Sequence, residues 1–508
     1  MHDHTFLSNR LNLIFKKFKN KIAIKSLNKN YYFRDLFFLA SKISDEIKKK
    51  NYKNQVIVIV ARKDFYTYAS IFACIFSGNS YSIIDFSMPL ERLKKILDKC
   101  NPKIIISSKK ENFKFFNQEV INSKIHKFTN KKKIKIEDVI KKVSDIQTCY
   151  IMFTSGSTGF PKGALINRGS LLKFSELCRQ NFSLKQNDNL TNLNPIYFDN
   201  SIFDIFASLL NGLTLSIFTE DDLKKPIKIF DKIKKLKPTV WFSTPSLLVY
   251  LINLKILSKN KIKYIKKIIF GGEAFPVDKL RQLYEIDNKK VLYNVYGPTE
   301  TTCICSSYRI QKKDIYNLKS DYVSVGKIWN SFNYNLVKKK KIVKNLKEIG
   351  ELHLFGHNIG MGYINDKEQS SKSFIFNKKN KIIGYKTGDL FYENKLNHLY
   401  FKGRKDNQVK VMGHRIELSE IEAALNNIEN VEEVSVFSKK NKETNKIIAV
   451  VCGKKLTSNK YIYEKISVKL PKYMIPSNIF LIKKMLKNAN GKIDRVKIKK
   501  IYEAKTLI

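Results

Sequence analysis

Short β-branched runs alternate with helical apolar runs near the N-terminus, and this alternation limits the fold more than any other feature of the sequence. The runs Gln55–Val60 and Ile104–Ser107 predict strands, and Tyr81–Asp85 predicts a further strand between them. An apolar segment that ends at Gly78 and the segment Leu90–Lys99 predict the intervening helices. Strands that alternate with helices build a parallel sheet covered on both faces. We therefore predict an α/β fold.

The alternation continues along the chain, and the composition changes after Arg404. A polar, lysine-rich segment, Lys109–Lys142, is expected at the surface. Beyond it the sequence predicts one helix at Leu171–Gln180 and strands at Thr239–Ser243, Lys267–Phe270, Val291–Asn294 and 350–354. From Val409 onward it predicts a small α+β unit, with helices at Ser419–Asn426 and Ile462–Leu470 and strands near 409, at 431–437 and at 447–452. Ser419, followed by two glutamates, favours a helix start at that residue.

The charge of the chain raises nucleic acid and anionic membranes as partners, but its distribution argues against both. Lysine and arginine number 95 against 45 acidic residues, a formal net charge of +50. Only eleven of the basic residues are arginines, and the lysines are spread over all 508 residues rather than gathered in a tail or a basic helix. A/T-rich codons explain them. We expect no nucleic-acid partner, although this field would attract ATP or an acidic carrier protein.

Cysteine usage and the apolar runs predict a cytoplasmic protein without a membrane span. The seven cysteines are scattered, with Cys303 and Cys305 the only close pair, which fits reduced thiols rather than disulfides or a zinc site. The segment Met1–Thr5 has no apolar signal core. The longest largely apolar run, Tyr68–Phe76, is too short to cross a bilayer and predicts a buried helix.

A loop rich in glycines and hydroxyl groups, Thr154–Gly163, follows a predicted strand at Tyr150–Phe153. Serine and threonine hydroxyls together with backbone N–H groups suit phosphate oxygens, and Lys162 adds a positive charge. The common phosphate-loop ending, Gly-Lys-Ser/Thr, is absent. Taken alone, such a loop is more often a linker. The motifs that follow favour an ATP site.

Six motifs in family order give the chain a resemblance to the adenylate-forming superfamily, which includes acyl-CoA synthetases, luciferases and amino-acid adenylation domains. They are the loop above and the segments Asn294–Thr302, Tyr385–Leu390, Gly403–Leu418, Leu470–Pro476 and Asn490–Arg495. Each alone could be a turn, but together they span most of the chain. The resemblance implies a large N-terminal domain, residues 1–404, of stacked mainly parallel sheets flanked by helices. It also implies a small mobile C-terminal domain, residues 405–508, with Asp406 at the hinge.

The resemblance implies ATP and Mg²⁺ and a reaction in which a carboxylate attacks the α-phosphorus of ATP and expels pyrophosphate. Two anions must approach each other, so we expect catalysis to depend on charge neutralisation and positioning. By resemblance, Lys492 binds the substrate carboxylate and the α-phosphate, Thr299 contacts the α-phosphate region and Glu300 holds Mg²⁺. The implied ATP-binding residues are Thr154, Ser155, Gly156, Ser157, Thr158, Gly159, Lys162, Asn294, Tyr296, Gly297, Asp389 and Arg404.

Several of these residues have an ordinary structural alternative. Asp389 would accept both ribose hydroxyls, with Arg404 nearby. Tyr296 would stack near adenine, but a core tyrosine is nearly as good an interpretation. Glu300 could be a surface carboxylate and Lys492 one more solvated charge.

The segment that begins Phe198-Asp199 indicates the class of acid. Fatty-acid and aryl ligases of this superfamily usually carry a histidine-containing stretch here, whereas amino-acid adenylating enzymes carry Phe-Asp. By this resemblance Asp199 binds the α-ammonium of an amino acid, the alternative being a helix N-cap. The predicted side-chain pocket comprises Asn200, Phe203, Phe242, Ile269, Gly271, Val295, Cys303 and Ile304. These residues are mostly apolar and include no second acid or base. With Gly271 leaving depth, they predict an uncharged, aliphatic substrate side chain.

We therefore predict a monomeric amino-acid ligase. It would form an aminoacyl-adenylate and pass the aminoacyl group to the phosphopantetheine thiol of a separate carrier protein. Free-standing D-alanine–carrier protein ligases are similar in length and share the stretch Ser243–Ser246, but they usually have cysteine at the position of Gly271, which leaves the amino acid open. The alternative is an acyl-CoA ligase with CoA as the thiol, and the remote alternative is a basic nucleic-acid-binding protein. Intact Lys492 and Glu300 argue against an inactive scaffold.

Overall fold

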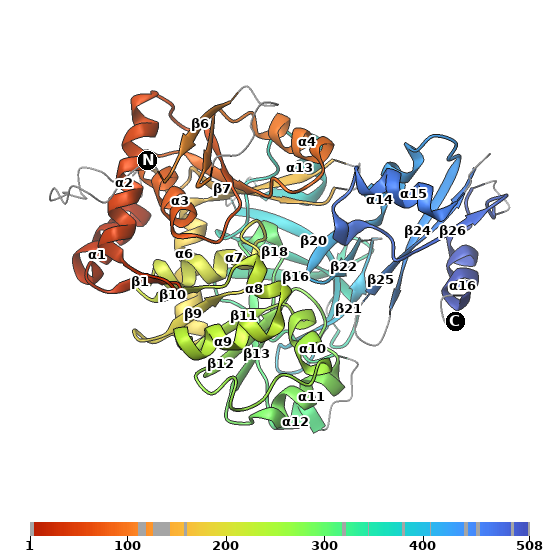
Figure 1. Cartoon of the computed structure of the whole chain (residues 1–508). Coiled ribbons are helices and arrows are strands. Elements are labelled where there is room, and N and C mark those ends of the chain that lie inside the picture. Colours follow the sequence, from red (N-terminus) through yellow and green to blue (C-terminus); the bar gives the residue numbers. More distant parts are fainter. Residues whose placement is uncertain are drawn as a thin grey trace. The chain divides into compact units, whose positions relative to one another are not determined.

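The computed structural model describes residues 5–109, 118–124, 143–156, 160–316, 322–343, 345–377, 382–406, 408–440, 445–453, 458–488 and 492–505. Most of the predicted surface segment Lys109–Lys142 lies outside these ranges, as do Ser157, Thr158 and Gly159 of the predicted phosphate loop. The contacts divide the chain into two compact units (Figure 1). The first comprises residues 1–86, 100–153 and 163–403, and the second comprises 87–99, 154–162 and 404–508.

A nine-stranded sheet is the largest element of the first unit. Its strands, in spatial order, are β15 (Lys327–Ile328), β14 (Ser306–Arg309), β13 (Val291–Tyr296), β12 (Lys267–Gly271), β11 (Val240–Ser243), β9 (Asn189–Asn192), β10 (Thr214–Ile217), β1 (Ile22–Lys25) and β2 (Asn30–Tyr32). The central strands from β13 through β1 pair in parallel, and the antiparallel pairs lie toward the two edges. The prediction of a mainly parallel sheet is confirmed here.

A second, six-stranded sheet contains the strands predicted near the N-terminus. Its order is β6 (Glu119–Asn122), β5 (Ile104–Ser107), β3 (Val56–Val60), β4 (Ser80–Ile84), β7 (Thr148–Thr154) and β8 (Lys162–Asn167). Each of the three predicted strands agrees with an observed strand to within one residue. The helix between β3 and β4, α3 (Phe65–Ser77), begins where the Asp64 side chain accepts a hydrogen bond from the Thr67 amide at 2.8 Å. It ends at Gly78, whose φ of 79° is left-handed and suits glycine.

A third sheet of the first unit is antiparallel, which the alternation of strands and helices does not predict. It comprises β17 (Lys341–Ile342), β16 (Phe332–Lys338), β18 (Gly350–Gly356), β20 (Ile382–Glu393) and β19 (Phe374–Asn377), with β21 (Leu399–Arg404) paired to β20. Two pairs of consecutive strands, β16 with β17 and β19 with β20, are antiparallel neighbours joined directly, as in hairpins. The alternation rule therefore applies to two of the three sheets.

Helices cover both faces of the nine-stranded sheet. One face is covered by α9 (Pro226–Leu236), α10 (Pro245–Asn253) and α11 (Val277–Ile286) (Figure 1). Residues of these helices share a core with Trp241, Ile268 and Phe270 of the sheet. On the other face Phe242 and Ile269 belong to a core shared with α1 (Phe6–Phe18), α2 (Phe33–Lys49), α3 and α6 (Arg168–Asn181). Strands buried on both faces read as unbroken apolar runs, as β11 and β12 do.

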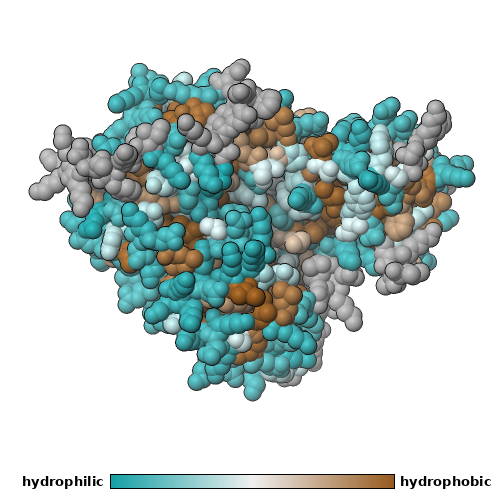
Figure 2. Space-filling model, in the orientation of Figure 1, coloured by the Kyte–Doolittle hydropathy of each residue, from teal (hydrophilic) through white to brown (hydrophobic). Residues whose placement is uncertain are grey.

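The remaining short elements of the first unit connect these layers. They are α7 (Asn200–Ile202), the π-helix η1 (Phe203–Ala207), α8 (Glu220–Lys224), the 3₁₀ turn η2 (Thr299–Thr301), α12 (Lys312–Tyr316) and α13 (Lys367–Ser373). Within the described ranges, no helix is long and apolar enough to cross a membrane. On the face drawn in Figure 2, hydrophilic side chains predominate and hydrophobic ones form separate groups.

The second unit contains most of α4 (Leu90–Cys100) and the C-terminal elements. These are β22 (Gln408–Val411), β23 (His414–Glu417), α14 (Leu418–Asn426), β24 (Glu433–Lys440), β25 (Asn445–Cys452), α15 (Asn459–Ser467), η3 (Lys472–Met474), β26 (Asn478–Ile482) and α16 (Arg495–Lys505). The helix predicted at Ser419–Asn426 agrees with α14 to within one residue, although Glu417 rather than Ser419 precedes its first turn. The predicted start of the second helix is wrong. The helix predicted from Ile462 begins at Asn459, because the Ser458 side chain accepts a hydrogen bond from the Tyr461 amide.

Candidate active site

The carboxyl ends of the parallel strands β9, β11, β12 and β13 meet at one edge of the nine-stranded sheet. In sheets of this kind, ligands bind beyond that edge. Most first-unit residues predicted for the site lie on these strands or just after them. Phe242 pairs in register with Ile269, and Gly271 with Val295, so these four lie on the same face of the sheet.

The predicted catalytic motif lies in the hairpin loop between β13 and β14. The two strands pair antiparallel, with Tyr296 opposite Ser306, and the loop between them includes η2. Thr302 and Cys303 are both left-handed, at φ 60° and 77°, although neither is glycine. Each such residue costs about 1–2 kcal/mol and clusters of them are typical of functional sites. Gly297 is required here, since a Cβ would lie 2.2 Å from the Cys303 carbonyl oxygen.

Asp199 and Thr299 are in direct contact although a hundred positions separate them. The Thr299 hydroxyl donates a hydrogen bond to Asp199 Oδ2 at 2.6 Å. Asp199 precedes α7, as the N-cap alternative requires, but its side chain makes no capping hydrogen bond to the helix. The contact therefore joins the residue expected to bind the substrate ammonium to the residue expected near the α-phosphate.

Glu300 is fully buried, which removes the alternative of a surface carboxylate. Its Oε1 accepts a hydrogen bond from the Tyr363 hydroxyl at 2.7 Å, and its carbonyl oxygen accepts one from the Gly360 amide at 2.7 Å. The described residues contain no group of three or more histidine, cysteine, aspartate or glutamate side chains that could hold a metal ion. Mg²⁺ is commonly held by one or two carboxylates together with substrate phosphates, so an oriented Glu300 fits that role.

Tyr296 and Asp389, predicted for adenine and ribose, are also in contact. The Tyr296 hydroxyl donates to Asp389 Oδ2 at 2.6 Å, and both residues are buried. Burial first, and then the negative charge of Asp389, raise the pKa of Tyr296 well above its ordinary value, so the phenol remains a donor. The Tyr296 ring meets Phe391 edge to face, with 5.0 Å between the ring centroids. Asn294, the other predicted nucleotide residue on β13, donates from its side-chain amide to the Ser324 carbonyl at 2.9 Å.

The predicted side-chain pocket is brought together in the first unit. Seven of its eight residues are buried, the exception being the half-buried Asn200. The Phe203 and Phe242 rings are T-shaped, with centroids 4.8 Å apart. Burial raises the pKa of Cys303 well above its ordinary value, so its side chain is a neutral thiol.

The prediction that Gly271 leaves depth in the pocket is wrong. A Cβ at Gly271 would lie 2.5 Å from both the Val295 side chain and the Val295 carbonyl oxygen. The neighbouring strand β13 therefore fills the space that the missing side chain leaves. The following residue, Gly272, is the more open one, since a Cβ there would meet nothing closer than Asn200 Nδ2 at 3.7 Å.

Residues 154–156 and 160–162 of the predicted phosphate loop belong to the second unit, where protein groups bind the Ser155 hydroxyl and the Gly156 amide. Ser155 donates to the Arg415 carbonyl at 2.6 Å and accepts from the Glu417 amide at 3.1 Å. The Gly156 amide donates to Glu420 Oε2 at 3.3 Å, and the same carboxylate forms a buried ion pair with Arg92. The Ser155 hydroxyl and the Gly156 amide, which the sequence predicts as donors to phosphate oxygens, therefore donate to protein oxygens in this structure.

Five more predicted residues lie in the second unit. The Thr154 hydroxyl donates to the Lys162 carbonyl at 3.5 Å. The Lys162 ammonium is 3.9 Å from Glu417 Oε1. Arg404 binds Asp406 with two nitrogens, at 2.6 and 2.7 Å. Although burial acts to raise it, the pKa of Asp406 is lowered by this guanidinium. Lys492 is exposed, and its backbone N–H donates to Asn488 Oδ1 at 3.1 Å.

Two residues of the site were missed by the sequence. Tyr363, the partner of Glu300, has no motif of its own and could not have been found. Asp204 follows the pocket residue Phe203 directly and is fully buried. The sequence does carry a signal for Asp204, because it is the one charged residue in the otherwise apolar segment 202–207, and aspartate is seldom buried without a partner.

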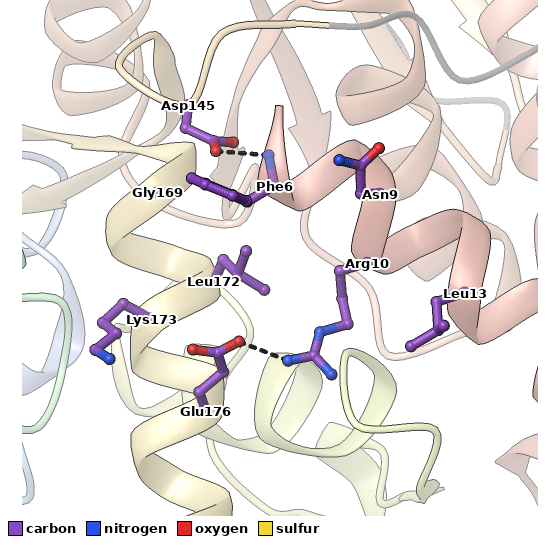
Figure 3. A pocket seen from close by; sticks show the side chains of 9 residues that line it. All are labelled: Phe6, Asn9, Arg10, Leu13, Asp145, Gly169, Leu172, Lys173 and Glu176. Atoms are coloured by element: carbon purple, nitrogen blue, oxygen red, sulfur yellow. Dashed lines mark hydrogen bonds and ion pairs between the residues drawn. The ribbon is translucent and has the colours of Figure 1, made fainter. Parts of the chain in front are cut away.

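A cavity of about 460 Å³ lies elsewhere in the first unit, between α1 and α6 (Figure 3). Arg10 and Glu176 form an ion pair across it at 2.6 Å, and Asp145 binds the first amides of α1. Its lining includes none of the predicted site residues.

Comparisons with known proteins agree with the fold and with the family that the motifs resemble. Residues 14–364 match the family described as AMP-binding enzyme, and residues 420–492 match the AMP-binding enzyme C-terminal domain. The D-alanine--D-alanyl carrier protein ligase of Bacillus cytotoxicus is 31% identical over 440 residues, covering 84% of this chain and 86% of the relative. The ligase of the same name from Bacillus cereus is 30% identical over 436 residues, 84% of this chain and 85% of the relative.

Solved structures share the fold at low sequence identity. Holo-PA1221, a protein with adenylation and PCP domains, superposes with a TM-score of 0.84 at 19% identity, covering 97% of this chain and 84% of that one. The Vibrio cholerae adenylation domain AlmE, solved with glycyl-adenosine-5'-phosphate, gives 0.83 at 19% identity and covers 99% and 98% of the two chains. Because one family match spans more than half of the sequence and the motifs stand in family order, this chain belongs to the AMP-binding enzymes.

Proposed function

We propose that this protein is an ATP-dependent ligase that activates a small, uncharged amino acid and transfers it to the phosphopantetheine thiol of a separate carrier protein. The observation that carries the proposal is the hydrogen bond between Thr299 and Asp199 at 2.6 Å. It brings an anion suited to an α-ammonium beside a hydroxyl suited to the α-phosphate. The names of the Bacillus relatives, carrier protein ligases at 30–31% identity, support the same activity.

The first step would join the amino acid to AMP. Asp199 would bind the ammonium and orient the carboxylate, whose oxygen attacks the α-phosphorus as the bond to pyrophosphate breaks. Thr299, whose hydroxyl proton is donated to Asp199, would contact the α-phosphate region, and Lys492 would neutralise the charge that accumulates there. Glu300 would hold Mg²⁺, which would supply further charge neutralisation. Asp389 and Tyr296 would hold the ribose and adenine.

The second step would transfer the aminoacyl group. The phosphopantetheine thiolate attacks the carbonyl carbon of the aminoacyl-adenylate, a thioester forms and AMP leaves. We assign this step to a rearrangement of the C-terminal domain about Asp406, with the domain boundary between residues 404 and 405. The protein would act as a monomer. It would act in the cytoplasm, where ATP is available and its seven free cysteines stay reduced.

The buried pocket residues support an aliphatic substrate side chain. Phe203, Phe242, Ile269 and Val295 are apolar, and a charged side chain would find no partner among them. Because strand β13 fills the space beside Gly271, the pocket favours a small side chain over a long one.

Amino-acid-dependent exchange of labelled pyrophosphate into ATP tests the proposal. A panel of glycine, both enantiomers of alanine, valine, leucine, serine, aspartate and lysine would be compared with propionate and butyrate. We expect exchange with small uncharged amino acids, and none with aspartate, lysine or the two des-amino acids. Exchange with none of the amino acids would refute the proposal. Exchange with propionate equal to that with alanine, followed by thioester formation on CoA, would favour the acyl-CoA ligase.

A further inference from the structure

A buried polar cluster lies directly behind the aromatic walls of the pocket, and none of the roles above uses it. Its centre is Asp204, the second residue of the π-helix η1, which is fully buried. Asp204 Oδ2 accepts hydrogen bonds from the amide nitrogens of the Asn192 and Asn194 side chains, at 3.0 and 3.1 Å. Asp204 Oδ1 accepts another from the Asn194 side chain at 3.2 Å. An ionised carboxylate needs such partners if it is to remain buried.

Asn194 connects this carboxylate to both aromatic walls. The same Asn194 amide nitrogen donates to the Phe242 carbonyl at 3.2 Å. Asp204 is bonded through the chain to Phe203, whose ring packs against that of Phe242. One side chain therefore bridges the strand that carries one wall and the π-helix that carries the other.

A buried lysine completes the cluster. The Lys63 ammonium donates to the carbonyls of Asn192 and Leu193, both at 3.0 Å. Burial lowers the pKa of Lys63 to about 8, and burial raises the pKa of Asp204 to about 7. The Tyr68 hydroxyl donates to Asn192 Oδ1. Five polar side chains thus converge behind a pocket that is otherwise apolar.

The π-helix itself depends on side chains for its geometry. The Ser175 hydroxyl donates to the Phe206 carbonyl at 3.0 Å, and the Asn211 side chain donates to the Ala207 carbonyl at 3.1 Å. The Ser208 hydroxyl donates to the Asp204 carbonyl at 2.6 Å. π-Helical turns are rare and are frequent at functional sites, where they displace one residue relative to an α-helix. Here the displaced turn begins at the pocket residue Phe203.

We propose that Asp204, acting through Asn194, is a positioning residue that holds Phe203 and Phe242 at a fixed separation and so sets the size of amino-acid side chain that the pocket accepts. The proposal rests on the proposed function. A buried carboxylate and ammonium are expensive to maintain, and apolar residues of similar volume would often be equally stable. Their presence at this point is explained if they restrict the pocket to one arrangement.

The test compares Asp204→Asn with a matched variant, Asp188→Asn, in pyrophosphate exchange. Asp188 is also buried, but it immediately precedes β9, at the amino end of the strand, whereas Asn192 ends it. It accepts from the Thr239 hydroxyl at 2.7 Å. Asp204→Asn turns one acceptor into a donor facing the Asn194 amide. We expect its KM for the preferred amino acid to rise about tenfold, as for loss of a hydrogen bond to a charged group, with KM for ATP within about twofold. The ratio of kcat/KM for the smaller of two aliphatic amino acids to kcat/KM for the larger should decrease.

Asp188→Asn should lower thermal stability while leaving both KM values and the size preference unchanged. Asn194→Ser removes the bridging side chain and keeps Asp204, and it should reproduce the changes in KM and size preference. It serves as the second variant if Asp204→Asn does not fold. Unchanged KM and size preference in a folded variant at either position would overturn the positioning role, even where stability falls. Absence of exchange by the wild-type protein with every amino acid would overturn the proposed function and the positioning role together.

Discussion

Replacing Asp199 by alanine separates an amino-acid ligase from an acyl-CoA ligase more directly than any other change. The carboxylate is half-buried and accepts a hydrogen bond from Thr299 at 2.6 Å. The substitution therefore removes two interactions. One is the proposed pairing with the substrate ammonium, and the other is the contact with Thr299, which exists whatever acid is bound.

The two losses differ in size and in dependence on the substrate. Truncating one partner of a buried, hydrogen-bonded charge pair costs about 2–5 kcal/mol, and the partial exposure of Asp199 places it near the lower value, about 2 kcal/mol. Loss of the acceptor for Thr299 costs about 1 kcal/mol. Because each 1.36 kcal/mol is about tenfold in rate, kcat/KM should fall about 150-fold for the amino acid and about fivefold for its des-amino analogue.

The assay is pyrophosphate exchange with the preferred amino acid and with the corresponding des-amino acid at high enzyme concentration. Thr299→Val is the matched control, since it removes the same hydrogen bond and keeps the Asp199 charge. It should slow both substrates by a similar factor. Equal losses for both substrates in Asp199→Ala would show that Asp199 does not bind an ammonium, and the assignment of the amino-acid branch would fail with it.

Three further perturbations test other parts of the structure. Lys492→Ala should reduce exchange by at least about a hundredfold, as for removal of a transition-state donor, with an unchanged melting temperature because the residue is exposed; wild-type exchange would exclude Lys492 from the chemistry. Gly271→Ala should destabilise the protein by about 1–3 kcal/mol in urea unfolding, because its Cβ would lie 2.5 Å from Val295, and equal stability would show that the two strands can separate. The pKa of Asp204 rises from 3.8 to about 7 on folding, so its contribution to the free energy of unfolding decreases between pH 4 and 7. The pKa of Lys63 falls from 10.5 to about 8, so its contribution increases between pH 8 and 10.5. The stability difference between wild type and a Lys63→Met, Asp204→Leu variant should then be lowest near pH 7–8, and a difference independent of pH would contradict it.

The parallel sheets could be predicted from the sequence, because their strands alternate with helices along the chain. The apolar segment before Gly78 could be assigned because an apolar run and the glycine that ends it are local signals, and the structure adds a cap at Asp64. The antiparallel sheet around β18 and β20 was not predicted, because its pairing joins segments whose sequences carry no mark of their partners. Ser458 provided a local signal for α15 that was overlooked.

For the site, the sequence indicated residues but not contacts. Asp199 and Thr299 were each identified through a motif, yet their hydrogen bond depends on how β13 lies in the sheet. Gly271 was misjudged for the same reason, since the space beside a glycine belongs to whichever strand is its neighbour. Residues that lie in no recognised motif, such as Tyr363, can be assigned to the site only from the structure, through the side chains that they bind.

The hairpin loop between β13 and β14 implies that activation and side-chain selection are physically coupled. It carries Thr299 and Glu300, the residues predicted to act on the phosphates, and it continues into Cys303 and Ile304, two buried residues of the predicted pocket. Contacts with neighbouring segments stabilise the left-handed backbone of this loop. One of them is the hydrogen bond that the Thr302 hydroxyl donates to the Asn358 carbonyl at 2.9 Å. Because Cys303 is buried and its backbone lies against Gly297, we expect a larger side chain there to shift the loop and Thr299 with it. Changes of specificity introduced on this loop should therefore alter kcat together with KM, whereas changes at Phe203, on a separate helix, can alter KM alone.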